Sequence, residues 1–506
     1  MMKLSRLLGL SMAILLGTAQ AEEALDLLIT NAQVVDGSGR AVYAADVGIR
    51  DDRIAFIGQW DEGGSVPAKQ RIDARGRILA PGFIDLHAHG DPQKDAAFTN
   101  FLAMGVTSIL LGQDGFGPVE DDYRQWQQQW EEQGSGVNIG MLVGHGSLRR
   151  ALDIGNQKDL SEQQMQQMSA QLKRSLGSSF GLSTGLEYVP ALYAKPQELV
   201  DLAQVVGKAD RLIMSHMRNE DDNALFAAID ELAAQGKHAR VHVSHIKSVY
   251  GKGAARGEQI IARLTELKQQ GIEISADFYP YNASYTGIAI LFPDWAKTGG
   301  QLKQVLPERR QELLEHLNAR VSARNGPEAT LFGSGPYQGL NLAEAAEKAG
   351  KPFAELLLDD IGPQGASAAY FIMDKALQGT LLEGPMVAIS SDGSPTMYHP
   401  RGYGAFAKLI EQYVVNEARL SLEQAVHKAT GLAADILKLP DRGRIAEGMK
   451  ADLILFYPEK VKANADYNQP HKLASGFDWV IVNGQIAWQQ SQPAARAGTL
   501  LLPEEH

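Results

Sequence analysis

The stretch from Arg77 to Asp91, with the sequence RILAPGFIDLHAHGD, decides how the rest of the chain is interpreted. A short apolar run meets a Pro-Gly turn, and a second apolar run then leads directly to His87 and His89. Because alternate side chains of a β-strand point to the same face, these two imidazoles project together and could bind one cation. Such pairs also arise by chance, so the prediction of a metal site depends on whether later strands end in similar residues.

Short alternating segments near both ends of the chain predict a small β domain. Close to the N-terminus, Gly, Asp and Asn residues separate segments such as Leu27–Thr30. Near the C-terminus, two further segments flank Asn483-Gly484, a strong hairpin signal. We therefore expect residues 22–80 and 445–506 to form one composite domain, with residues 81–444 inserted between its halves.

The middle section alternates apolar segments with helical patterns, which is typical of βαβ units and a parallel sheet. Eight short apolar segments suit strands that are buried on both faces, and they lie at Phe83–Leu86, Thr107–Gly112, Ile139–Val143, Ser179–Thr184, Leu212–Ser215, Ala239–Ser244, Glu273–Phe278 and Met386–Ser391. Eight such units predict an α/β fold of the (β/α)₈ type, a TIM-like barrel, whose active site lies at the C-terminal ends of the strands. The gap before the last strand exceeds a simple crossover, so we expect an insertion at about 281–385.

The composition and the first 21 residues limit the possible partners and the location of the protein. A formal net charge of −12 and the lack of a Lys/Arg-rich run argue against binding to nucleic acid or anionic lipid. Residues 1–21 combine two basic residues, an apolar run and an Ala-Gln-Ala ending, which predicts a signal peptide cleaved after Ala21. An uncleaved N-terminal anchor is the alternative. We expect a periplasmic or secreted protein that is free of the membrane after cleavage, and the sequence leaves its oligomeric state open.

Each predicted barrel strand leads to a polar residue that can bind a metal ion or move protons. In strand order these residues are His87 and His89, Asp114, His145, Glu187, His216, His245, Asp277 and Asp392. A folded barrel would bring them to one catalytic mouth. The set is rich in imidazole and carboxylate, and the chain has no Cys, which suits zinc, with manganese, iron or nickel as alternatives.

This ligand set points to the hydrolysis of amides or related C–N bonds. A divalent cation lowers the pKa of a bound water molecule and polarises a carbonyl oxygen. The departing nitrogen then needs a proton, which a carboxylate beside the metal can carry. Asp392, at the end of the last strand, is the candidate for this general acid/base, and a buried residue that caps the following turn is the alternative.

Several motifs together carry a family resemblance. PGFIDLHAHGD, the later SHM and VSH histidines, SSDG and the C-terminal GRIAEGMKADLILF resemble the amidohydrolase superfamily. GHGSLR, GLSTGLEYVP, SHMRNE, HVSHIK, DFYPY and HPRGYG resemble its D-aminoacylase branch, the N-acyl-D-amino-acid deacylases. This resemblance spans almost the whole mature chain. It implies a hydrolase with one or two zinc ions that removes N-acyl groups from D-amino acids or cleaves D-configured dipeptides.

The resemblance also implies roles for individual residues. His216 and His245 would hold a tightly bound metal ion, His87 and His89 would line a second, weaker position, and Asp392 would be the general acid/base. The residues that would hold the substrate carboxylate are Lys247, Tyr188, Arg401 and one tyrosine of the YPY run, Tyr279 or Tyr281. Lys and Arg suit carboxylates, and Arg can bind them bidentately.

One position departs from the family pattern. Members of this branch usually carry a Cys ligand in a GNCG turn after the second strand, whereas this chain reads GQDG with Asp114 in the Cys place. Aspartate can bind zinc or bridge two cations, and Glu187 could bridge instead. The alternatives are an Asp114 that merely favours the turn and structural roles for Glu187 and Asp277.

Other assignments stay open at this point. His145 is a candidate at the substrate site, where it would orient a ligand, or it simply starts a helix. His242 is predicted to pack against helices, and Lys247 and Arg401 could be plain surface charges. Alternative functions are a cyclic-amide hydrolase of the hydantoinase or dihydroorotase kind, an isoaspartyl-type dipeptidase, or a binding protein that keeps the metal without turnover.

Overall fold

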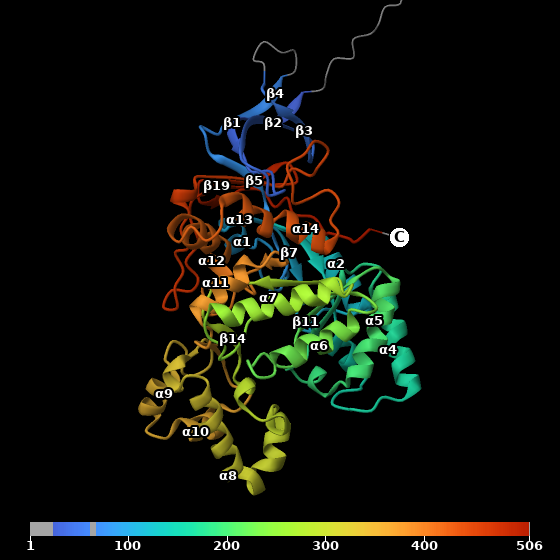
Figure 1. Ribbon diagram of the computed structural model, residues 1–506, viewed down its shortest axis with the longest axis vertical. Helices are drawn as coiled ribbons and strands as arrows, with labels where there is room; N and C mark the ends of the chain where they lie inside the picture. The colour runs from blue at the N-terminus through green and yellow to red at the C-terminus, as the bar shows by residue number, and fades with distance from the viewer. Residues whose placement is uncertain (1–23, 61–66, 505–506) are drawn as a thin grey trace, which may run out of the picture.

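The computed structural model describes residues 24–60 and 67–504, so the predicted signal peptide lies outside the described residues. Three parts follow one another along the long axis in Figure 1: a small β domain, a barrel and an inserted subdomain. In the described part of the chain, no helix has the length and apolar character needed to cross a membrane.

Both ends of the chain contribute to one nine-stranded sheet. Its strands are β1 (Leu25–Val34), β2 (Tyr43–Arg50), β3 (Arg53–Gly58), β4 (Ala68–Asp73), β5 (Ile78–Pro81), β18 (Leu453–Phe456), β19 (Phe477–Val482), β20 (Gln485–Gln489) and β21 (Gln492–Pro493). The antiparallel pair of β5 and β18 joins the two chain ends. Asn483 and Gly484, which connect β19 to β20, have φ of 48° and 77°, as a tight hairpin turn requires. The predicted composite β domain is therefore confirmed.

All eight predicted barrel segments contain strands. They are β6 (Phe83–Asp85), β7 (Val106–Leu111), β8 and β9 (Asn138–Met141 and Val143–Gly144), β10 (Gly181–Gly185), β11 (Leu212–His216), β12 (Arg240–Val243), β13 (Ile274–Phe278) and β17 (Val387–Ile389). Neighbouring strands pair in parallel in this order, and the third strand is interrupted at Leu142. The ring closes where Ala88 bridges Gly393 and the Asp392 N–H donates to the His87 carbonyl at 2.8 Å. This closure brings the functional residues of the first and last strands together.

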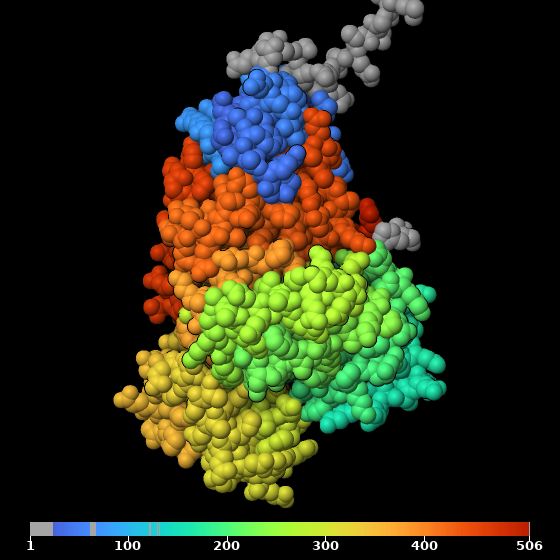
Figure 2. All heavy atoms as spheres, in the orientation of Figure 1, coloured from blue at the N-terminus to red at the C-terminus, as the bar shows by residue number. Residues whose placement is uncertain are grey.

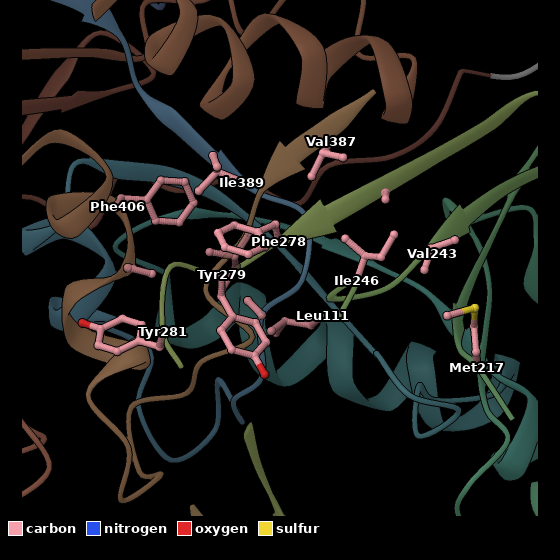
Figure 3. Close-up of a cluster of buried hydrophobic side chains, with 14 of the residues drawn as sticks. Leu111, Met217, Val243, Ile246, Phe278, Tyr279, Tyr281, Val387, Ile389 and Phe406 are labelled. Carbon is pink, nitrogen blue, oxygen red and sulfur yellow. The ribbon is translucent and has the colours of Figure 1, made fainter. Parts of the chain in front are cut away.

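Helices cover the outside of the barrel: α1 (Thr99–Ala103), α2 (Glu120–Gln133), α3 (His145–Ala151), α4 (Glu162–Ser175), α5 (Pro196–Lys208), α6 (Leu225–Gln235), α7 (Ala254–Gln269), α11 (Lys375–Glu383), α12 (Arg401–Lys408), α13 (Leu422–Ala429) and α14 (Gly431–Leu437). Buried apolar side chains fill the space between strands and helices. Figure 3 shows part of this core, where Phe278 and Ile389 lie beside Phe406 of α12. The packed core fixes where each strand ends, and so where the residues after it lie.

The insertion forms a separate lobe, drawn in yellow at one end of the molecule (Figures 1 and 2). It contains an antiparallel sheet in the order β14–β16–β15, with β14 at Ser284–Gly287, β15 at Thr330–Phe332 and β16 at Ser367–Tyr370. Its α-helices are α8 (Gly299–Ala323), α9 (Leu342–Ala349) and α10 (Phe353–Glu355). The predicted range of 281–385 extends too far at its end, because α11 packs against α7 as a barrel helix. A helical sequence pattern does not reveal which neighbour a helix covers, so the sequence could not place this boundary.

Candidate metal centre and active site

A cavity of about 390 Å³ lies at the C-terminal ends of the barrel strands. Most of the predicted site residues line it: His89, Asp114, Glu187, Tyr188, His216, His245, Lys247, Tyr279, Asp392 and Arg401. His87 is fully buried beside them, with its Nε2 atom 3.7 Å from Asp392 Oδ1. The barrel therefore brings together residues that are as much as about 300 positions apart in the sequence.

One group of possible metal ligands consists of Asp114, His216 and His245. The His216 Nδ1 and His245 Nε2 atoms lie 3.1 Å apart, and His245 Nε2 lies 3.5 Å from Asp114 Oδ1. A second group consists of His87, His89, Asp114 and Asp392. Asp114 belongs to both groups, which suits a carboxylate that bridges two cations.

Backbone conformation directs three of these side chains into the cavity. Asp114, His245 and Asp392 have positive φ values of 56°, 38° and 47°. Asp and His enter this left-handed region more readily than most residues. Each of the three follows the end of a strand, so the turn, and not the alternation of the strand, sets the direction of the side chain.

The loop that carries Asp114 is held tightly against the neighbouring strands. Gly115 N–H donates to Ser183 Oγ at 3.0 Å, and Gln113 Nε2 donates to the Leu86 carbonyl at 2.7 Å. A Cβ atom on Gly185 would lie 2.1 Å from the Asp114 carbonyl oxygen, so glycine is required there. These contacts fix Asp114 between the first and fourth strands of the barrel.

The donor atoms fit a divalent metal ion. Among the described residues, nothing donates to or accepts from either ring nitrogen of His87 or Asp114 Oδ1, although all three atoms are buried. Leaving a buried polar atom unsatisfied costs about 1–3 kcal/mol. Converging imidazole nitrogens and carboxylate oxygens are the ligands that zinc and related cations prefer.

The electrostatics of the site favour ionised carboxylates. Burial alone would raise the pKa of Asp114, but the adjacent His87 and His245 hold that pKa well below its usual range. Burial also raises the pKa of Asp392, but Arg401 and the neighbouring His245, His89 and His87 together outweigh it, so the pKa of Asp392 is lowered as well. Two buried anions at the mouth of the barrel attract cations, and Asp114 and Asp277 raise the pKa of His87 against the effect of burial.

Lys247 and Arg401 are both buried, which excludes the interpretation that they are plain surface charges. The Arg401 guanidinium lies 2.8 Å from Asp392 Oδ2, and the Arg401 N–H donates to His399 Nδ1 at 3.1 Å. Lys247 Nζ donates to Glu220 Oε1 at 2.7 Å. Two cationic side chains therefore face the cavity beside the possible metal ligands.

Sequence reasoning missed Glu220. Its Oε1 atom lies 3.2 Å from His245 Nδ1, and it groups with Glu187 and His216 as a further set of possible ligands. A carboxylate on the far nitrogen of an imidazole orients a metal ligand in many metal sites. Glu220 stands four residues after His216 in the SHMRNE motif, away from any strand end, so only the motif itself could have pointed to it.

The prediction that His242 packs against helices is wrong. Its Nε2 atom lies 2.8 Å from Asp277 Oδ2, and both side chains are fully buried. The flanking Val241 and Val243 belong to the apolar core, so His242 points into the barrel. Asp277 also accepts the His245 N–H at 2.9 Å, so it fixes the backbone of a possible metal ligand.

Two predicted substrate-binding residues do not line the cavity. Figure 3 shows the hydroxyl of Tyr281 pointing in a different direction from that of Tyr279, and Tyr281 instead donates to the Pro400 carbonyl. His145 starts α3, as its helical alternative predicted, and its Nε2 atom lies 2.7 Å from Glu198 Oε1. The chain turns into α3 directly after β9, which carries the His145 side chain away from the cavity.

Comparisons with known proteins agree with this site. The profile of the amidohydrolase family matches residues 341–487, and that of the urease alpha-subunit N-terminal domain matches residues 10–69. An N-acyl-D-glutamate deacylase from Alcaligenes xylosoxydans xylosoxydans is 32% identical over 95% of this chain and 97% of its own length. The N-acyl-D-aspartate deacylase of the same organism is 30% identical over 94% and 95%.

A solved structure extends the likeness to three dimensions. The N-acyl-D-glutamate deacylase from Bordetella bronchiseptica, complexed with zinc and a phosphonate that mimics the tetrahedral intermediate, is 29% identical. It aligns with a TM-score of 0.81 over 95% of this chain and 100% of its own. By the identity that spans nearly its full length, the chain belongs to the N-acyl-D-amino-acid deacylase and D-aminoacylase branch of the amidohydrolases, hydrolases of amide C–N bonds other than peptide bonds.

Proposed function

We propose that this protein is a zinc-dependent deacylase that removes the N-acyl group from N-acyl-D-amino acids. The observation that carries the proposal is the buried pair of Arg401 and Asp392, which lie 2.8 Å apart in the cavity. A cation that binds the α-carboxylate of a substrate there would hold the neighbouring amide next to the acid/base. The deacylases of D-glutamate and D-aspartate derivatives among its relatives support the D configuration.

The residues that would hold zinc are those of the two groups around Asp114. His216 and His245 would bind one ion with Asp114, and His87 and His89 would bind a second position with Asp114. When bound, the metal supplies Lewis-acid chemistry, because it lowers the pKa of a water molecule and polarises the amide carbonyl. The zinc in the solved relative supports this choice of metal.

The protein's own residues would then carry the proton and hold the substrate. Asp392, which is ionised because its pKa is lowered, accepts a proton from the attacking water and returns it to the departing nitrogen. Arg401 and Lys247 bind the substrate carboxylate, and Tyr279, whose ring lies against both cations, closes that side of the cavity. Burial of these charges strengthens each interaction relative to water.

We also propose that the protein is exported. The basic residues, apolar run and Ala-Gln-Ala ending of residues 1–21 support a signal peptide. Sequencing the N-terminus of protein recovered from the periplasm tests this proposal. A mature chain that begins at Glu22 would support cleavage after Ala21, and an intact N-terminus in the cytoplasmic fraction would contradict it.

A panel of substrates tests the proposed activity. Zinc-loaded protein should release free amine from N-acetyl-D-amino acids and leave the L-enantiomers largely intact, and D-configured dipeptides belong in the same panel. Turnover only of a hydantoin or of a β-aspartyl dipeptide would replace the proposal with a cyclic-amide hydrolase or an isoaspartyl dipeptidase. Failure to hydrolyse any amide would favour a binding protein.

A further inference from the structure

Three strongly basic side chains line the cavity: Lys247, Arg401 and Arg324. Two of them have carboxylate partners, since Lys247 pairs with Glu220 and Arg401 pairs with Asp392. Arg324 differs, because no carboxylate of the described residues lies within ion-pair distance of its guanidinium. It is the cavity cation that the proposed mechanism leaves without a role.

Arg324 is placed by the inserted lobe. It caps the C-terminus of α8, and only 4% of its surface is exposed. Its guanidinium lies over the ring of Tyr370 in β16, 4.9 Å from the ring centre. The buried Nε atom of Arg324 has no hydrogen-bond partner among the described residues, and the neighbouring Tyr250 hydroxyl offers the guanidinium only an uncharged group.

A buried guanidinium without an anion is costly unless a ligand completes its hydrogen bonds. Two acidic residues of the cavity lining are already paired with other cations, Glu220 with Lys247 and Asp221 with Arg320. An anionic group that enters the cavity would therefore find Arg324 free to bind it. The planar guanidinium suits a carboxylate, which it can bind through two hydrogen bonds.

We propose that Arg324 binds a second carboxylate of the substrate, in addition to the α-carboxylate assigned to Arg401 and Lys247. The proposal rests on the proposed deacylase function and names its substrate class: N-acyl-D-amino acids with two carboxylates. The second carboxylate belongs either to an acidic side chain of the D-amino acid or to a dicarboxylic acyl group. Both sources offer the same chemistry, so the substrates of the test separate them.

The test compares substrates that differ in one charge. N-acetyl-D-glutamate is measured against N-acetyl-D-glutamine, and N-succinyl-D-leucine against N-butyryl-D-leucine. A site built around a buried charged partner rejects the neutral analogue strongly, so the wild-type kcat/KM should favour the charged member of one pair by about 100-fold or more. The pair with the large ratio identifies the source of the carboxylate. Ratios near one for both pairs overturn the proposal.

Variants assign the discrimination to Arg324. Arg324→Gln should lower the charged-to-neutral ratio by about 100-fold, and Arg324→Lys should keep part of it. Arg310→Gln is the matched control, because Arg310 lies on the same helix, is 43% exposed and pairs with Asp359. A ratio that survives in Arg324→Gln, or that falls equally in Arg310→Gln, contradicts the proposal.

Binding measurements test the role of Arg324 independently of whether the protein hydrolyses these substrates. Calorimetry on zinc-loaded Asp392→Asn protein, with N-acetyl-D-glutamate, N-succinyl-D-leucine and their neutral partners as ligands, needs no turnover. Tighter binding of one charged ligand, lost in Asp392→Asn/Arg324→Gln, supports Arg324 even if none of these amides is hydrolysed by the wild type. Hydrolysis of D-substrates without any preference for the second carboxylate would leave the deacylase function standing and remove the Arg324 proposal.

Discussion

The guanidinium of Arg401 lies 2.8 Å from the carboxylate of Asp392, and both side chains are buried at the mouth of the barrel. The contact joins the residue proposed to hold the substrate with the residue proposed to move the proton. Arg401 is the largest of the influences that stabilise the anion, and with the neighbouring histidines it keeps the pKa of Asp392 below its usual range against the effect of burial. A change at Arg401 should therefore alter both substrate binding and the pH dependence of the reaction.

Arg401→Met should reduce kcat/KM for N-acyl-D-amino acids by about 100-fold, because the substrate carboxylate loses its buried partner. The pKa of Asp392 should rise at the same time, since the positive charge beside it is gone. Activity that requires ionised Asp392 disappears as the pH falls, so the acidic limb of the kcat/KM profile should move to higher pH. Arg401→Lys should shift the limb less, and an acidic limb that stays in place in Arg401→Met would contradict the pairing.

Asp392→Asn removes the proposed proton carrier while it keeps the size of the side chain. The turnover number should fall by about 10²- to 10⁴-fold, as expected for the loss of a general acid/base. Metal analysis and thermal unfolding should show that the protein still folds and holds zinc between His216 and His245. Activity within tenfold of the wild type would show that another group carries the proton.

Asp114→Ala tests whether this carboxylate serves both groups of ligands. The variant should bind less metal than the wild type, because Asp114 lies 3.5 Å from both His87 Nε2 and His245 Nε2. Asp114→Cys is the informative partner variant, since a thiolate favours softer cations such as zinc over manganese. Elemental analysis after dialysis against mixed metals measures both effects. Unchanged metal content and preference in the two variants would mean that Asp114 only shapes its turn.

A buried network outside the cavity should contribute to stability. Glu198 accepts hydrogen bonds from Arg149 and lies 2.7 Å from His145 Nε2. Burial raises the pKa of Glu198, but His145 and Arg149 lower it further, so the net shift is downward. Glu198→Gln should cost about 3–5 kcal/mol at neutral pH, because Arg149 is left buried without its anion.

The pH dependence of this cost follows from the direction of the shift. A carboxyl group with a lowered pKa stabilises the fold above its unfolded value and loses that contribution as the pH falls through the folded pKa. The difference in free energy of unfolding between wild type and Glu198→Gln should therefore shrink below about pH 4.5. Urea unfolding at pH 7 and pH 4 measures it, and a constant difference would argue against an ionised Glu198.

The parts of the fold that depend on local pattern could be predicted from the sequence. Buried parallel strands are short and apolar, and residues at the end of a strand or in the turn after it lie at the barrel mouth. The positions of His87, His216 and Asp392 could therefore be predicted, although a turn sets the direction of the Asp392 side chain. The directions of side chains in turns were harder to predict. Strand alternation put His242 on the face opposite to His245, but His245 has a positive φ and lies beyond the strand, so the alternation does not apply to it. The pattern does not extend into such turns.

Cavity residues that do not stand at the end of a barrel strand could not be found from the strand pattern. Glu220 follows a strand end by four residues, and Arg324 comes from the end of a helix in the inserted lobe. Only the tertiary packing of that lobe against the barrel brings Arg324 to the cavity. The end of the insertion was misplaced for the same reason, since the helical pattern of α11 does not show that this helix packs against α7.

The central claim is that imidazoles and carboxylates from the barrel strands hold a divalent cation between them. A crystal of the protein grown with zinc, with anomalous diffraction recorded at the zinc absorption edge, tests it most directly. We predict a strong peak within coordination distance of His216, His245 and Asp114, and a second, weaker peak near His87 and His89. Anomalous peaks only at other places, with these side chains free of metal, would contradict the account.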